Sequence, residues 1–278
     1  MNLTMKLTCL LENTTDLPQL QPRHGLSLYL ETETHRILFD FGPDDTFARN
    51  AEQLGIDLSA VDLAFLSHGH YDHGGGLPVF LDRNDHAPVY LHRNAFVPHW
   101  SAGGDNMRYI GLDQSLKSNP RIHTANGVTH LQRGLTLISG ASGRRFLASS
   151  NQNLCADRAD GVKIPDDFSH EQSLIVEENG VSLLIAGCAH SGIVNILEQA
   201  QAVAGHPMTH VISGFHLYQP SRGISEPADN VRAIAQALGQ TPAQFFTCHC
   251  TGLPSYRILH EQLGEKIAYF SAGMQVDL

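Results

Sequence analysis

The run HGHYDH, residues 68–73, places four potential metal ligands within six residues. Imidazole nitrogens bind zinc at about 2.0–2.1 Å and carboxylate oxygens at about 2.0–2.2 Å, so ligands must converge on one small volume. The run follows the apolar segment 63–66 and precedes three glycines, which allow a tight backbone. A polar surface loop with unrelated histidines is the alternative. We predict that this loop binds metal through His68, His70, Asp72 and His73.

Three later segments also place metal-ligating residue types directly after an apolar stretch: GCAHSG at 187–192, GFHL at 214–217 and CHCTG at 248–252. In layered α/β folds, residues at strand ends gather along one edge and build the site. We therefore expect His190 and His249 to be metal ligands. At His216 we favour a general base or a substrate contact over a metal ligand. A capping or packed histidine is the alternative at each position.

Composition narrows the class of protein. The 278 residues include 18 Lys and Arg against 28 Asp and Glu, a net charge of −10 that argues against non-specific nucleic-acid binding. Five cysteines, an odd number in a long chain, argue against a disulfide framework. The start, MNLTMKLTCLLEN, is typical of a strand and not of a signal peptide, and no stretch reaches the roughly 18 apolar residues of a membrane span. We expect a cytoplasmic protein with a small-molecule substrate and neither nucleic-acid nor membrane partners.

The pattern of elements recurs in the two halves of the chain. Apolar runs predict a hairpin at 24–30 and 36–40, followed by a helix at 45–54. A second hairpin is expected around the Asn179-Gly180 turn, followed by strand–helix alternation. We predict an α/β fold, a sandwich of two mixed sheets covered by helices. It would be one domain, residues 1–278, with a less regular region at about 99–167 that could cover the site. The helices expected in the second half are 193–204, 230–238 and 256–263, and its strands are 210–212, 244–247 and 267–270.

The segment SHGHYDHGGGL, residues 67–77, resembles the H-x-H-x-D-H signature of the metallo-β-lactamase superfamily. Other blocks are similar to the subgroup named for 7,8-dihydropterin-6-methyl-4-(β-D-ribofuranosyl)-aminobenzene-5′-phosphate synthase. These blocks are LEN at 11–13, HGLS at 24–27, ILFDFG at 37–42, GCAHSGI at 187–193, GFHL at 214–217 and CHCTG at 248–252.

The resemblance implies an αββα sandwich with the site at one edge of the two sheets. It also implies two metal positions. The first would be bound by His68 and His70 and completed by His190. The second would be bound by Asp72 and His73 and completed by His249.

The sequence departs from the superfamily pattern at Cys188, which stands where most members have an aspartate that bridges both metals. A thiolate could bridge soft metals in its place. His170, before the second hairpin, is a rival to His190 as third ligand of the first metal. The pair Cys248 and Cys250 also suggests a zinc site, although a C-x-C pair alone is a weak indication.

These residues predict metal-dependent hydrolysis. One or two divalent ions, zinc or else manganese or iron, would lower the pKa of a bound water from 15.7 to about 7. Asp72 would bind the metal and also orient that water, and His216 would protonate the leaving group. Arg144 and Arg145 could clamp a phosphate or form a solvated loop. The first expectation for the substrate is a phosphate ester or cyclic ester, and the resemblance to the subgroup implies a phosphorylated pterin-like or ribosyl molecule. A di-iron redox enzyme and a ligand-binding protein without turnover are the alternatives.

Overall fold

The computed structural model describes residues 5–103, 106–132, 134–220 and 222–278, so residues 1–4 of the expected first segment lie outside it. The chain divides into two compact units. The first comprises residues 1–126, 155–164 and 271–278, and the second comprises residues 127–154 and 165–270. The expectation of a single domain stays a prediction.

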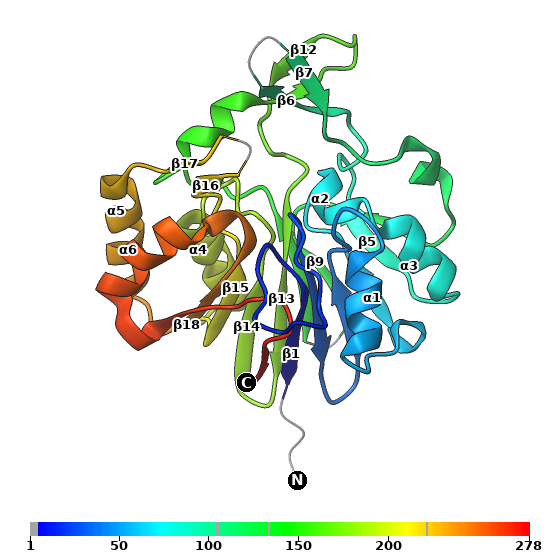
Figure 1. Ribbon diagram of the computed structural model, residues 1–278, viewed down its shortest axis with the longest axis horizontal. Coiled ribbons are helices and arrows are strands. Elements are labelled where there is room, and N and C mark those ends of the chain that lie inside the picture. Colours follow the sequence, from blue (N-terminus) through cyan, green and yellow to red (C-terminus); the bar gives the residue numbers. More distant parts are fainter. Residues whose placement is uncertain (1–4, 104–105, 133, 221) are drawn as a thin grey trace. The chain divides into compact units, whose positions relative to one another are not determined.

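The first unit contains a seven-stranded mixed sheet within its described residues (Figure 1). The first hairpin is antiparallel, with Leu28 opposite Phe39, and its second strand pairs in parallel with the next strand of the chain. This confirms the predicted first hairpin. In spatial order the strands are β20 (Gln275–Asp277), β1 (Lys6–Leu11), β2 (Ser27–Glu31), β3 (Arg36–Phe39), β4 (Leu63–Phe65), β5 (Val89–His92) and β8 (Ile122–Ala125).

Two helices cover one face of this sheet, α1 (Thr46–Gln53) and α3 (Leu77–Arg83) (Figure 1). Phe47 of α1 and Phe80 of α3 join buried strand residues in a single apolar cluster. The Phe80 ring lies 5.4 Å from that of Phe41, measured between centroids. Burying a phenylalanine side chain contributes about 1.5–3 kcal/mol, so this cluster fixes the segments on both sides of the histidine run.

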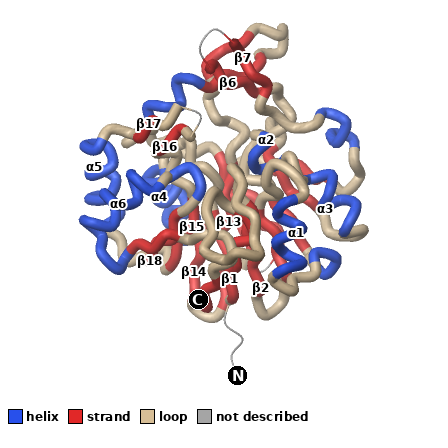
Figure 2. Tube along the Cα trace, viewed as in Figure 1, coloured by secondary structure: helices blue, strands red, loops and turns tan. Residues whose placement is uncertain are grey.

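The region expected to be less regular contains a small four-stranded sheet (red in Figure 2). The Trp100 indole nitrogen donates a hydrogen bond to Asp157 at 2.9 Å, and Lys163 Nζ lies 4.0 Å from the centre of the Trp100 ring. Ordered contacts therefore exist where the sequence showed no clear periodicity. The role of this region in covering a site stays a prediction. Its strands are β12 (Lys163–Pro165), β11 (Leu154–Asp157), β6 (His99–Gly103) and β7 (Asn106–Tyr109).

The second unit contains another seven-stranded mixed sheet within its described residues. Its hairpin turns at Asn179 and Gly180, both with positive φ, as predicted for this Asn-Gly pair. Four neighbouring strands run parallel, so their carboxyl ends lie at one edge of the sheet: β14 (Val181–Ile185), β15 (His210–Ser213), β18 (Gln244–Thr247) and β19 (Ile267–Tyr269). In spatial order the strands are β19 (Ile267–Tyr269), β18 (Gln244–Thr247), β15 (His210–Ser213), β14 (Val181–Ile185), β13 (Gln172–Glu178), β10 (Leu135–Ser139) and β9 (Thr129–Gln132).

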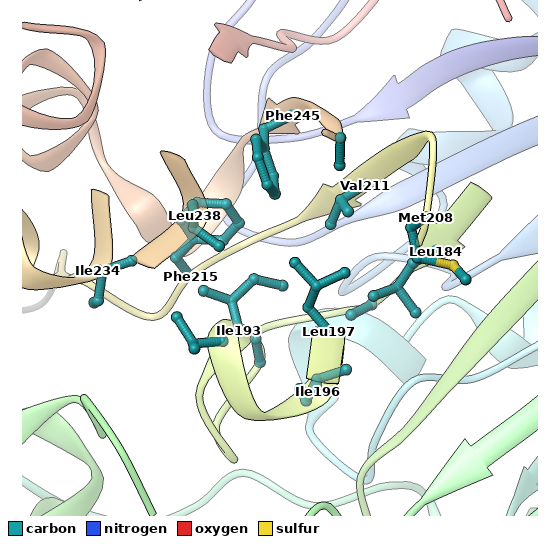
Figure 3. Packing of buried hydrophobic residues seen from close by; sticks show 14 of the residues in the cluster. Leu184, Ile193, Ile196, Leu197, Met208, Val211, Phe215, Ile234, Leu238 and Phe245 are labelled. Carbon is teal, nitrogen blue, oxygen red and sulfur yellow. The ribbon is translucent and has the colours of Figure 1, made fainter. Parts of the chain in front are cut away.

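The core of the second unit joins this sheet to helices α4 (Ile193–Ala204), α5 (Ala228–Gly239) and α6 (Leu253–Leu263). Figure 3 shows Leu197 of α4 and Leu238 of α5 among the buried side chains of this cluster. The packing fixes the points where the strand-end segments leave the sheet. The remaining short elements are α2 (Tyr71–Gly74), β16 (Tyr218–Gln219), β17 (Ile224–Ser225) and the 3-10 turns η1 (Leu58–Ala60), η2 (Gln114–Ser118), η3 (Ser149–Asn153), η4 (His249–Thr251) and η5 (Gly264–Lys266).

Across the described ranges, none of the helices combines the length and the apolar character needed to cross a membrane.

Candidate metal centre

The four predicted ligands of the histidine run lie together in the first unit. Each is buried, with at most 8% of its surface exposed. The ring centre of His68 lies 4.5 Å from that of His70 and 4.2 Å from that of His73. Asp72 Oδ2 lies 3.9 Å from His73 Nε2. Burying this many polar groups is costly without compensation, and a set of three imidazoles and one carboxylate fits a divalent metal.

A buried network of Asp40 and Ser67 orients two of these histidines. Asp40 Oδ2 accepts hydrogen bonds from His73 Nδ1 at 2.6 Å and from Ser67 Oγ at 2.7 Å. Ser67 Oγ also lies 2.8 Å from His68 Nδ1. Because the single serine hydrogen goes to Asp40, the serine oxygen accepts the Nδ1 hydrogen of His68. Both imidazoles then keep the Nε2 lone pair for a metal, and such supporting partners usually raise ligand basicity.

Sequence reasoning missed three residues of this neighbourhood. Asp40 lies within the ILFDFG block and His24 within HGLS, but neither was assigned a role there. His24 Nε2 lies 3.2 Å from Asp72 Oδ2, and the His99 ring centre lies 5.4 Å from that of His70. His99 had no sequence signal, since its place depends on the folding of the small sheet.

Gly69, between the first two histidines of the run, is required by close backbone packing. A Cβ atom there would lie 2.2 Å from the carbonyl oxygen of Ala95 and 2.9 Å from His99 Nε2. We expect Gly69→Ala to lower the free energy of unfolding by about 1–3 kcal/mol, and to weaken metal binding because the run must move.

Chemical denaturation and metal titration of Gly69→Ala would measure both effects. Gly239→Ala is the control, since a Cβ there meets only Leu263 Cδ2, at 3.5 Å. Equal stability and metal affinity for Gly69→Ala and the wild type would contradict the role given to this glycine.

In the second unit, His190 follows β14 in a loop held by a buried carboxylate. Glu171 accepts hydrogen bonds from the backbone amides of His190 at 2.6 Å and Ser191 at 2.9 Å. Burial raises the pKa of the Glu171 carboxyl, and these hydrogen bonds offset part of that rise. His190 Nδ1 lies 3.2 Å from Asn151 Oδ1, and its ring stacks on Phe168 with centres 4.5 Å apart. If Nδ1 donates to Asn151, the Nε2 lone pair is left for a metal.

Cys188 is the residue on which the second unit's candidate ligands converge. Its sulfur lies within 4.8 Å of a ring nitrogen of His190 and, likewise, of His249. His249 is fully buried at the start of η4, directly after β18, and has a positive φ of 49°. The rival candidate, His170, places Nε2 3.2 Å from Asp166 Oδ2, and both are buried. That His190 and His249 bind metal stays a prediction.

His216 lies beside two cysteines of the same unit. One of its ring nitrogens is within 4.8 Å of the sulfurs of Cys188 and Cys250, and both ring nitrogens are shielded from solvent. Its ring centre lies 4.1 Å from that of His190. Burial acts to raise the pKa of the Cys250 thiol, but the hydrogen bond with Cys188 and the charges of His249 and His216 hold that pKa well below its usual range.

The two arginines considered as a phosphate clamp make local contacts. Arg145 pairs with Glu198 on α4, and the Arg144 guanidinium donates to the carbonyl oxygens of Ala141 and Gly143 at 3.1 and 3.0 Å. These contacts account for the conformation of their loop. Phosphate binding by this pair stays a prediction.

Comparison with known proteins identifies the family. Residues 20–203 match the family described as the Metallo-beta-lactamase superfamily. The chain is 28% identical to "Uncharacterized protein MJ0448" of Methanocaldococcus jannaschii over 236 residues, which cover 83% of this chain and 84% of that protein. It is 27% identical to the same organism's 7,8-dihydropterin-6-methyl-4-(beta-D-ribofuranosyl)-aminobenzene-5'-phosphate synthase over 272 residues, 90% and 88% of the two chains.

A solved structure of a related protein supports the same family assignment. The crystal structure of Tm1679, described as a metal-dependent hydrolase of the beta-lactamase superfamily, matches with a TM-score of 0.83. The two proteins are 27% identical, and the match covers 99% of each chain. The predicted fold class and the stated resemblance are therefore confirmed. The chain belongs to the metallo-beta-lactamase superfamily.

Proposed function

We propose that this protein is a metal-dependent hydrolase of small-molecule esters or phosphoesters. The observation that carries the proposal is the buried group of His68, His70, Asp72 and His73, whose two network-held histidines keep Nε2 for a metal. We also propose that His190 and His249 of the second unit bind metal. Zinc suits a set of imidazole and carboxylate ligands, and manganese or iron are the other candidates.

The bound metal would supply an activated water and stabilise the developing oxyanion. The chain's own residues would hold and orient the reactants. Asp72, with His24 at 3.2 Å, has a carboxylate whose orientation is fixed and which can accept a hydrogen bond from the attacking water. Asp40 and Ser67 would keep His73 and His68 in the tautomers that bind metal.

The substrate class is the finer part of the proposal. One relative is named as a synthase that forms a phosphorylated product, and the solved relative is described as a hydrolase. Both descriptions are compatible with a metal site that acts on a small phosphorylated molecule. We therefore propose a phosphoester or cyclic phosphate of a pterin-like or ribosyl molecule as substrate.

Metal removal tests this function. Protein purified without added metal is expected to contain one or two divalent ions per chain, and treatment with a chelator should reduce hydrolysis of a phosphodiester and lactone panel by at least about a hundred-fold. This loss exceeds the 10–100-fold cost of losing a single supporting contact, because the activated water itself is lost.

Zn²⁺, Mn²⁺ and Fe²⁺ would each be added back to find which ion restores turnover. Full activity of metal-free protein would contradict the proposal. Oxygen consumption by the iron-loaded protein without hydrolysis would identify a redox enzyme. Metal and ligand binding without any turnover would identify a binding protein.

A further inference from the structure

Two thiols and one imidazole meet at the carboxyl ends of three neighbouring parallel strands of the second unit. Cys188 follows β14, His216 follows β15 and Cys250 lies after β18. Their ligand atoms all lie within 4.8 Å of one another. Both cysteines are only 3% exposed. The group is therefore preassembled by the sheet, since three adjacent strands deliver one member each.

The backbone around Cys250 is shaped to hold its sulfur in this group. A Cβ atom on Gly214 would lie 2.6 Å from Cys250 Sγ, so only glycine leaves room for the sulfur there. The backbone amide of His216 donates a hydrogen bond to the same sulfur at 3.2 Å. Hydrogen bonds to a ligating sulfur are typical of metal–thiolate sites, where they tune and orient the ligand.

We propose that Cys188, His216 and Cys250 bind a thiophilic divalent cation, zinc, at a site of their own in the second unit. Two thiolates and one imidazole form a ligand set used by zinc, with a fourth position left for water or a small ligand. Thiolate ligands favour zinc over magnesium, calcium or manganese. Binding releases the two thiol protons to solvent, because the ligands bind in their deprotonated forms.

This site assigns His216 the role of metal ligand, which its sequence context favoured less than that of a general base or a substrate contact. An imidazole that binds zinc through one nitrogen cannot at the same time use that nitrogen to protonate a leaving group. The proposal does not rest on hydrolysis, because it concerns metal binding by the second unit's thiols. Cys188 nevertheless also lies within 4.8 Å of ring nitrogens of His190 and His249, so the test must separate this site from the one that they would serve.

Cobalt titration of the reduced, metal-free chain under anaerobic conditions tests the proposal. Thiolate ligation of Co²⁺ gives a charge-transfer band in the near ultraviolet that imidazole and carboxylate ligands do not give. The wild type is expected to show this band, and Cys188→Ser and Cys250→Ser should each lose at least half of its intensity. His216→Ala should weaken Co²⁺ binding at the band by about ten-fold or more, since a ligand is lost. Gly214→Ala should weaken Co²⁺ binding at this site by about 10–100-fold, the cost of disturbing a contact that supports a ligand.

Two control variants make the result specific. Cys248→Ser alters a buried cysteine two residues from Cys250 that does not belong to the group, and it should keep the full band. His68→Ala should also keep the band while losing cobalt bound through imidazoles, so failure of the hydrolase proposal would leave this one intact. Circular dichroism and thermal melting would confirm that each variant is folded.

Several outcomes would overturn the site. These are a wild type without the band, an unchanged band in Cys250→Ser, and loss of the band in His68→Ala. The last would assign the thiolate to the histidine run's metal. A Cys188–Cys250 disulfide that persists in the reduced protein, detected by mass spectrometry, would overturn it as well.

Discussion

Replacing His68 with alanine is expected to remove nearly all metal-dependent turnover while the protein remains folded. His68 is fully buried, its ring lies 4.5 and 4.2 Å from two further histidine rings, and Ser67 holds its Nδ1 atom. Its loss removes a direct ligand, so the effect should exceed the 10–100-fold cost of disturbing a supporting partner. We expect kcat/KM to fall by at least about a thousand-fold, or about 4 kcal/mol of transition-state stabilisation.

Steady-state kinetics with metal analysis of the same samples would measure this effect. His86→Ala is the matched control, because His86 is an exposed histidine of the same unit whose side chain pairs only with exposed Asp85 among the contacts described for it. The control should keep its metal and its activity. A His68→Ala variant that retains full metal content and wild-type turnover would contradict the proposed centre.

Replacing Asp40 with alanine is expected to damage both stability and metal binding. Asp40 is fully buried and accepts hydrogen bonds from the Ser67 amide, the Ser67 hydroxyl and His73 Nδ1. Removing the carboxylate leaves buried donors without an acceptor, a change that costs about 3–5 kcal/mol when a buried ionic partner is lost. Metal affinity should fall by about 10–100-fold as His73 loses its orienting partner.

Denaturant unfolding of the metal-free protein and a zinc competition titration separate the two effects of Asp40→Ala. Asp40→Asn helps to distinguish the contribution of side-chain shape from that of the negative charge, since asparagine keeps the volume but offers a single acceptor oxygen. Asp45→Asn is the control, because that carboxylate makes only an exposed pair with Arg49, worth at most about 1 kcal/mol. If zinc affinity were the same in Asp40→Ala as in the wild type, the network would have no part in metal binding.

The elements of the second half could be predicted closely because their apolar patterns are long and regular. The helix expected at 193–204 and the strand expected at 244–247 have the same bounds in the structure, as α4 and β18. Their buried residues recur at helical or strand spacing and meet a single core. Local pattern and tertiary packing agree in these segments, so the sequence alone was sufficient.

The small sheet could not be predicted for the opposite reason. The four residues of β7 are all exposed, so they show no alternation of buried and exposed positions. β6 lies next to β11, about fifty residues later in the chain, and the Trp100–Asp157 hydrogen bond links the same two segments. Such pairing depends on contacts that are distant in sequence, and a short exposed strand leaves little trace of them.

The candidate site likewise contains residues that the sequence alone indicated and residues that only the folded structure reveals. Residues that could ligate a metal were found because histidine, aspartate and cysteine clusters have a direct chemical signal, as in the run 68–73. Their supporting residues, Asp40, Glu171 and Asn151, lie far from them in sequence and act through hydrogen bonds formed only in the folded chain. An isolated carboxylate or amide has no characteristic spacing along the sequence that would indicate such a supporting role.

The parallel strands of the second unit have an evolutionary consequence. Since β14, β15 and β18 each end in a short connection that carries potential ligands, a substitution there alters the donor set while the frame of the sheet is kept. Exchanging a hard oxygen donor for a soft sulfur at the position of Cys188 would be one such step, and a change of one codon would then alter the preference of the site among metal ions. Lineages that share this scaffold can therefore diversify their inorganic chemistry without first having to acquire a new architecture.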